Sequence, residues 1–169
     1  MANKNATLRA PDWCLLWSHP LHFLSLGMGT GLAPTAPGTV GSLLGFPLFW
    51  LLMGLPVWQQ HASLLVLFLL GIWCCHVTGK ALGVSDHGAI VWDEVVAMAW
   101  VLVSVPVGLA WGLAAFGLFR LFDIWKPFPI AWVDARVKGG LGVMLDDVLA
   151  AAMAIAVLQV AKGYFDGLP

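Results

Sequence analysis

Charged residues are scarce in this chain, and their scarcity excludes an ordinary soluble domain. Only 10% of the 169 residues are charged, whereas 60% are hydrophobic and the mean hydropathy is +0.89. A typical soluble domain carries about 25% charged residues. A chain of this length has too little polar surface to cover so much apolar material in water. The composition therefore predicts helices packed in a lipid bilayer.

Cysteine and net charge are also low, and each excludes a class of protein. The three cysteines include the adjacent pair Cys74 and Cys75 within an apolar run, and their odd number and spacing fit neither a zinc site nor a disulfide scaffold. We expect them to be small buried apolar residues. The formal net charge of −1 gives no field that would attract nucleic acid, so no nucleic-acid partner is expected.

The few charges are concentrated between residues 80 and 147, which hold seven acidic and five basic residues. The uncharged blocks on either side and within this range predict an all-α, polytopic membrane protein with about four to five membrane helices and short interfacial helices. The expected membrane helices span residues 43–58, 63–78, 90–105, 109–124 and 146–162. We expect one membrane-embedded domain, 21–164, between an N-terminal cytoplasmic segment, 1–20, and a C-terminal tail, 165–169.

The uncharged block 95–119 is either one tilted span or a hairpin of two shorter helices. Pro106 and Gly108 near its middle favour a turn. Basic residues occur before the first helix, after the second and after this block, and such residues stay in the cytoplasm. All three groups lie on one side only if the block crosses the membrane an even number of times. We therefore favour the hairpin, which brings the polar motifs to the cytoplasmic face.

Two pairs of adjacent carboxylates stand where apolar helices are expected to begin. They are Asp93–Glu94 and Asp146–Asp147, and the second pair is expected to cap its helix after a flexible glycine-rich approach. Carboxylates leading into a membrane helix are costly without a partner. Mg²⁺ prefers such oxygens and keeps waters that a phosphate can replace. The alternative to a metal site is that these carboxylates are simply solvated charges at the starts of helices, and both interpretations stay open.

A short polar stretch, DHGAIVWDE, precedes the first of these helices. Asp86 lies two helical turns before Asp93, so the two would share a face if Gly88 does not break the helix. His87 is the one histidine within a polar motif and is a candidate general acid or base.

A third motif, RLFDIWKPFPIAWVDARVK, places Arg120, Asp123 and Lys126 three residues apart on one helical face. They are either mutual salt bridges or a carboxylate ligand between two phosphate-binding cations. Asp134 is either a helix cap or a further ligand.

A fourth motif, GMGTGLAPTAPGTVGS over residues 27–42, is too rich in glycine and proline for a regular helix through most of its length. Such a segment presents backbone N–H groups and hydroxyls, as oxyanion binders do. Thr39 and Ser42 are expected at the start of the next helix. The alternative is a plain helix-breaking connection.

Together, GTGLAPTAPGTVGSL, DHGAIVWDE, FRLFDIWKPFPIAWVD and GGLGVMLDD resemble the phosphatidylglycerophosphatase A family, in the family's order and over about residues 21–150. The resemblance implies an all-helical, Mg²⁺-dependent phosphatase, multi-pass in the bacterial inner membrane, with its active site on the cytoplasmic face. The implied substrate is the lipid phosphatidylglycerophosphate, and the products are phosphatidylglycerol and inorganic phosphate.

The resemblance also implies three sets of site residues by motif position. The catalytic candidates are Asp93, Glu94, Asp123 and Asp147. The metal-binding candidates are Asp86, Asp93, Glu94, Asp123, Asp146 and Asp147, with Asp134 as a further acidic position. The substrate-binding candidates are Thr39, Ser42, Arg120 and Lys126. One departure is Ala97, where the family often has glycine.

Other functions fit the sequence less well. The chain lacks Cys-x5-Arg, DxDx[TV] and K-x6-RP, the signatures of three other phosphatase types, so a metal-activated water is expected in place of a covalent nucleophile. A membrane cation transporter or channel would place carboxylates through the membrane depth, where the apolar blocks have none. A CDP-alcohol phosphotransferase would carry DxxDGxxAR, which is absent.

Overall fold

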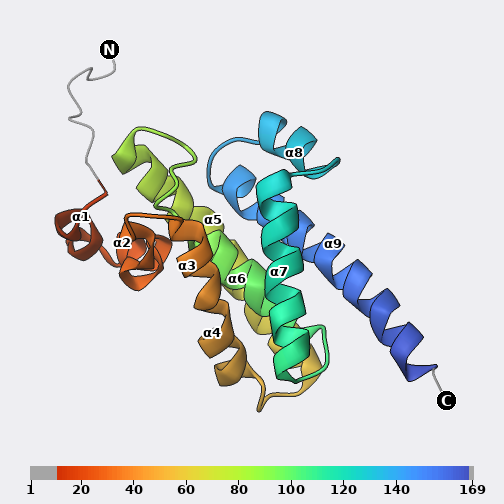
Figure 1. The fold of residues 1–169 in the computed structure, drawn as a ribbon. Helices are drawn as coiled ribbons and strands as arrows, with labels where there is room; N and C mark the ends of the chain where they lie inside the picture. The colour runs from red at the N-terminus through yellow and green to blue at the C-terminus, as the bar shows by residue number, and fades with distance from the viewer. Residues whose placement is uncertain (1–10, 168–169) are drawn as a thin grey trace.

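The computed structural model describes residues 11–167, and every regular element in that range is helical, as predicted (Figure 1). Lys4 and Arg9 of the expected cytoplasmic segment lie outside the described residues. The helices are α1 Trp13–Ser18, α2 Pro20–Ser25, the 3₁₀ helix η1 Gly27–Leu32, α3 Pro37–Leu43, α4 Gly45–Leu52, α5 Val57–Leu82, α6 Trp92–Val103, α7 Leu109–Trp125, α8 Ile130–Arg136 and α9 Gly140–Asp166.

Helix α6 is the centre of the bundle. Nine of its twelve residues are buried, and α3, α4, α5, α7 and α9 all pack against it. Its residues after Glu94 are apolar on every side, as a helix must be when protein surrounds it. Asp93 and Glu94, in the first turn of α6, are therefore surrounded by neighbouring helices.

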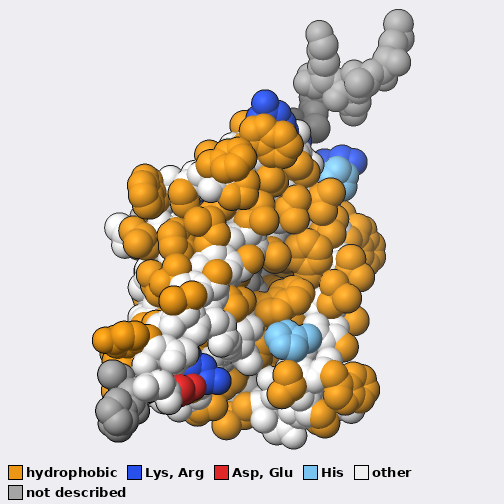
Figure 2. Space-filling model, turned by 90° about the vertical axis from the view of Figure 1, so that its right-hand side faces the viewer, with side chains coloured by type: hydrophobic (Ala, Val, Ile, Leu, Met, Phe, Trp, Pro, Cys, Tyr) orange, Lys and Arg blue, Asp and Glu red, His pale blue; other side chains and the backbone are white. Residues whose placement is uncertain are grey.

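The longest helices are α5, with 26 residues, and α9, with 27. By length and composition these two could cross a membrane, and at 1.5 Å per residue each is about 40 Å long. The apolar stretch Pro37–Leu52 and helices α6 and α7 are shorter, so two candidate spans are found where four to five were predicted. Figure 2 shows a largely hydrophobic face, with charged side chains only toward its upper and lower ends.

The predicted hairpin within 95–119 is confirmed. Helix α6 ends at Val103, α7 begins at Leu109, and the intervening turn contains Pro106. The two helices then pack side by side. As a result Asp93 and Glu94, at the start of α6, and Asp123, near the end of α7, lie at the same end of the bundle.

The expected helix 43–58 is wrong in its bounds. The helical stretch begins earlier, with α3 at Pro37, it is interrupted only at Leu44, and α4 ends at Leu52. Pro56 is the N-cap of α5, because proline has no N–H to donate within a helix and is tolerated at its start. The expected break at residues 59–61 is therefore helical, and Gln60 Nε2 donates to the Leu55 carbonyl at 2.8 Å.

Two further expectations about helix boundaries are corrected. Helix α9 begins at Gly140, so Asp146 and Asp147 lie about two turns inside it instead of capping it. A Cβ on Gly140 would overlap the Ile72 carbonyl, so this glycine permits close packing of α9 on α5. Residues 83–91 form a connection between α5 and α6, so Asp86 does not share a helical face with Asp93.

Candidate functional site

Three carboxylates from two helices meet inside the bundle, and we call them the carboxylate cluster. Asp93 and Glu94 come from the first turn of α6, and Asp147 comes from α9. One oxygen of each lies within 4.8 Å of the other two. Asp93 and Asp147 are only 8% and 3% exposed. The sequence predicted these three residues as site residues, and the fold brings them together.

The carboxylate cluster has unmet bonding capacity. Among the described residues, Asp93 Oδ1, Glu94 Oε2 and Asp147 Oδ2 are buried without a hydrogen-bond partner. Buried, unpartnered polar atoms are costly, and neighbouring carboxylates repel one another. Hard oxygen donors at this spacing suit a divalent cation, which would offset both effects. The residues present therefore fit a metal ion.

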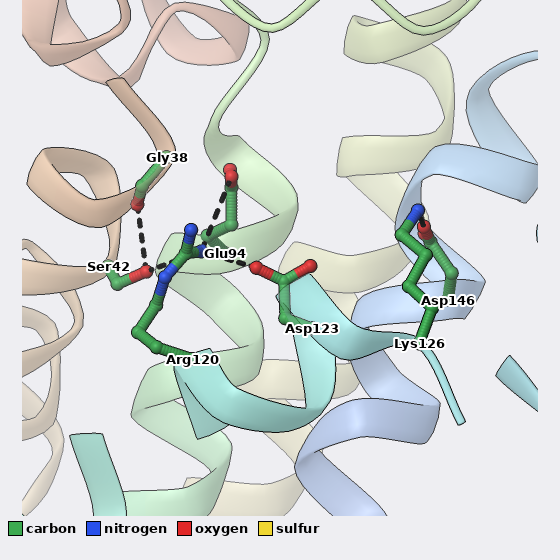
Figure 3. Close-up of polar contacts among 7 residues, drawn as sticks. All are labelled: Gly38, Ser42, Glu94, Arg120, Asp123, Lys126 and Asp146. Carbon is green, nitrogen blue, oxygen red and sulfur yellow. Dashed lines mark hydrogen bonds and ion pairs between the residues drawn. The ribbon is translucent and has the colours of Figure 1, made fainter. Parts of the chain in front are cut away.

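Arg120, on the inner face of α7, lies beside the carboxylate cluster (Figure 3). Its Nη1 atom is 3.8 Å from Glu94 Oε1, donates to Ser42 Oγ at 3.4 Å and forms an ion pair with Asp123 Oδ2. The Ser42 hydroxyl donates to the Gly38 carbonyl at 2.8 Å. Arg120 Nε is buried and has no partner in the described part of the chain, so the guanidinium retains a free donor.

Gly38 is a site residue that sequence reasoning missed. A Cβ built on it would overlap Glu94 Oε1 and lie 3.4 Å from Arg120 Nη1. Only glycine lets the first turn of α3 approach the carboxylate cluster this closely. A sequence signal for its position was available. Proline is favoured at the start of a helix, so Pro37 predicts that Gly38 lies in the first turn of α3. Thr39 lies in the same turn, partly buried.

Lys126 forms a second charged group with Asp146 and Asp134. Its Nζ atom lies 2.6 Å from Asp146 Oδ2 and 3.2 Å from Asp134 Oδ2. Lys126 is the C-cap of α7 with φ of 46°, a left-handed conformation that turns the chain away from Arg120. Burial alone would lower the pKa of Lys126, but hydrogen bonds and charge from Asp146 and Asp134 raise that pKa above its ordinary value. Lys126 therefore stays positively charged.

Asp86 and His87, which the sequence also suggested for the site, lie outside the carboxylate cluster. Asp86 is exposed on the connection between α5 and α6, where it lines a cavity of about 50 Å³ with Asp134 and Lys138. His87 Nδ1 accepts from the backbone N–H of Ala89 at 3.1 Å. Thus the structure places Asp86 near the Lys126 group and separates Asp146 from Asp147. Metal binding by Asp86 and Asp146 stays a prediction.

Asp123 lies between Arg120 and Asp147 of the carboxylate cluster. It pairs with Arg120 three residues earlier on α7, and its carboxylate lies next to that of Asp147. Asp123 therefore links Arg120 of α7 to Asp147 of α9.

Fold and site together define a helical, strongly apolar protein in which buried carboxylates that could hold a metal ion lie beside an arginine. The chain belongs to the phosphatidylglycerophosphatase A family, whose sequence model matches residues 23–162. This confirms the resemblance seen in the sequence motifs.

Named relatives agree with the family match. The phosphatidylglycerophosphatase A of Escherichia coli strain K12 is 44% identical over 146 residues, covering 85% of this chain and 84% of the relative. That of Haemophilus influenzae is 46% identical over 144 residues, covering 83% and 87%. A chain from Bacteroides thetaiotaomicron, provisionally named a phosphatidylinositol-3-phosphatase, is 38% identical over 147 residues, covering 82% and 91%. No solved structure gives a significant match.

Proposed function

We propose that this protein hydrolyses phosphatidylglycerophosphate to phosphatidylglycerol and inorganic phosphate in phospholipid synthesis. The observation that carries the proposal is the carboxylate cluster, whose unpartnered buried oxygens lie beside Arg120. This combination can hold a cation and bind an anionic phosphoryl group at the same place. Membership of the phosphatidylglycerophosphatase A family supports the choice of substrate.

The cofactor in this proposal is Mg²⁺, held by Asp93, Glu94 and Asp147. When bound, Mg²⁺ supplies positive charge that polarises the phosphoryl oxygens and activates water. Oxygen-only donors favour Mg²⁺ over metals that prefer thiolate or imidazole ligands. Asp123 could also bind the metal, and this role is the alternative to accepting a proton from the attacking water.

The chain's own residues then have distinct roles. Arg120 binds phosphoryl oxygens and neutralises the charge that builds there, and Ser42, whose Oγ accepts from Arg120 Nη1, positions the guanidinium. Asp123 orients Arg120 and takes the proton of the attacking water as the new P–O bond forms. The P–O bond to the glycerol breaks, and that proton leaves with the glycerol oxygen. Thr39 is placed on α3 to bind substrate, and Lys126 offsets the charge of Asp146.

We further propose a multi-pass protein of the bacterial inner membrane, with the site at the cytoplasmic face. The length and apolar character of α5 and α9 support membrane insertion. The hairpin of α6 and α7 supports further spans if flanking residues or local thinning of the bilayer make up for their short length. In this arrangement the lipid tails stay in the bilayer while the head group enters the site.

The test is phosphate release from a panel of lipid phosphates, with Mg²⁺ or with EDTA. The panel contains phosphatidylglycerophosphate, phosphatidic acid and phosphatidylinositol 3-phosphate. We expect Mg²⁺-dependent release from the first, lost in Asp93→Asn and Asp147→Asn variants that elute as folded protein. Near-normal activity of both variants would overturn the assignment. Cation flux in liposomes without phosphate release would favour the transporter, and CMP release would favour the phosphotransferase.

A further inference from the structure

A cavity of about 270 Å³ lies between α4 and α7, at the opposite end of the bundle from the carboxylate cluster. It is lined by Phe46, Phe49 and Trp50 of α4, Leu102 of α6, the turn 105–108 and the first residues of α7. Its volume is close to the lower limit of small-ligand pockets, about 300 Å³. The lining side chains are apolar, so the cavity suits a hydrocarbon and not a polar ligand.

The cavity and the Arg120 region of the site lie along the same face of α7. On α7, Gly112, Phe116 and Arg120 are spaced four residues apart, so they share a face. On the opposite side, Ser42 lies in the last turn of α3 and Phe46 in the first turn of α4.

Matched contacts join the two sides along this face of α7. Arg120 Nη1 donates to Ser42 Oγ at 3.4 Å, and the Phe46 and Phe116 rings lie 6.4 Å apart. A Cβ on Gly112 would lie 3.3 Å from the Phe46 ring. Between the polar partners at the site and the apolar cavity, the two aromatic rings therefore fill the space between α4 and α7. Both rings are only partly buried, so a chain can reach the cavity along their exposed edges.

The dimensions suit a lipid. Eight residues of helix separate Gly112 from Arg120, which corresponds to about 12 Å along α7. Between the terminal phosphate of phosphatidylglycerophosphate and its acyl chains lie a glycerol, a phosphodiester and a second glycerol. A phosphate held by Arg120 therefore leaves the acyl chains near Phe46 and Phe116. The rim residues Trp50, Leu109 and Leu113 are exposed, so the cavity opens toward the surface that would face lipid.

We propose that the cavity between α4 and α7 receives the distal part of an acyl chain of the lipid substrate, and that the chain reaches it along the partly exposed edges of Phe46 and Phe116. We call the cavity and these edges the α4–α7 groove. The inference rests on the proposed function and deepens it, because it assigns the tail of the same substrate. Phe46 and Phe116 contact the chain between head group and cavity. Gly112 is a specificity-determining position, because a side chain there fills the cavity.

The first test is photo-crosslinking of the wild-type protein. The probe is a non-hydrolysable phosphonate analogue of phosphatidylglycerophosphate with a diazirine midway along one acyl chain, added with Mg²⁺ in nanodiscs. We expect labelled peptides from α4 and the start of α7, and loss of this label when unlabelled substrate competes. Competed label on the other large apolar groove, which Val157 and Phe165 of α9 line, or no competed label at all, would overturn the proposal.

The second test compares two leucine substitutions on the same helix. Gly112→Leu fills the cavity, whereas Gly117→Leu is the matched control, because no described atom lies within 4 Å of a Cβ there. Both variants are assayed with dioleoyl and dihexanoyl substrates. We expect Gly112→Leu to lower the long-chain to short-chain ratio of kcat/KM severalfold, because the excluded chain returns to lipid and loses its packing contacts in the cavity.

An unchanged ratio in Gly112→Leu, even at reduced total activity, would contradict the proposal, as would an equal change in Gly117→Leu. If a second copy of the chain occupied the groove instead, Gly112→Leu would change the oligomeric state in native mass spectrometry and leave the ratio unaltered. Failure of the wild-type protein to release phosphate from any substrate would refute the proposed function. The crosslinking result would still report on the α4–α7 groove.

Discussion

Lys126 and Asp146 join the end of α7 to α9 through a contact of 2.6 Å between Nζ and Oδ2. Asp147, the next residue, instead joins Asp93 and Glu94 in the carboxylate cluster. Successive residues of a helix point about 100° apart, so two adjacent carboxylates reach two different groups. The pair DD therefore contains one candidate metal ligand and one partner of a lysine.

This division predicts unequal effects of the same substitution at two adjacent positions. Asp147→Asn removes a charged oxygen from the carboxylate cluster and should lower activity at least about 100-fold, because disturbing even the partners of metal ligands costs about 10–100-fold. Asp146→Asn should cause a clearly smaller loss. The measurement is kcat/KM and the Mg²⁺ concentration for half-maximal activity. Equal losses in the two variants would show that both residues serve the metal.

Removing Lys126 should destabilise the protein through the carboxylate that it leaves behind. Lys126→Met leaves the buried Asp146 unpaired, and we expect a loss of about 2 kcal/mol, between the values for exposed and for buried ion pairs. The double variant Lys126→Met/Asp146→Asn should recover part of this loss. Thermal unfolding in detergent provides the comparison. A double variant less stable than the single one would contradict this explanation.

Gly38→Ala tests the close approach of α3 to Glu94. The added Cβ would overlap Glu94 Oε1 and displace the carboxylate or α3, and small displacements of catalytic groups can cost on the order of 100-fold in rate. We expect a loss of tenfold to 100-fold by this reasoning. Gly54→Ala, where no described atom lies within 4 Å of the new Cβ, should behave like wild type. Similar losses in both variants would point to a general effect on folding.

Mg²⁺ should stabilise the folded protein independently of any reaction. A ligand that binds only the folded state adds about 2.7 kcal/mol at 100 times its dissociation constant. We expect a higher unfolding midpoint with Mg²⁺ than with EDTA in wild type, and a much smaller difference in Asp93→Asn. Scanning calorimetry without substrate measures this difference in unfolding midpoint. An undiminished shift in the variant would place the ion elsewhere.

The sequence predicted which polar segments come together better than it predicted the helix ends. Charge placement and the positive-inside rule predicted the hairpin at Pro106, and with it the meeting of Glu94 and Asp123. Glycines were the main source of error, because Gly140 looks like a flexible residue in sequence. Its role becomes visible only when α5 lies against it, and no local pattern reports such a long-range contact.

Asp86 is a second case in which a local sequence pattern did not predict the structure. Its spacing from Asp93 suits a continuous helix, but α5 ends at Leu82. Its C-cap Gly83 has a left-handed φ of 75°, and the chain is not helical again until Trp92. Periodicity predicts which residues share a face only after the helix boundaries are known. The separation of Asp146 from Asp147 likewise depended on where Lys126 points, which the left-handed end of α7 decides.

The central position of α6 has a consequence for how the protein is made. Synthesis proceeds from the N-terminus, so Asp93 and Glu94 emerge well before Asp147 and the rest of α9. Until α9 arrives, one side of α6 lacks the helix that covers it in the finished bundle. A chain released before residue 140 would therefore hold Asp93 and Glu94 without the third member of the carboxylate cluster and with apolar surface uncovered. The bundle around α6 is thus complete only when α9 has packed against it.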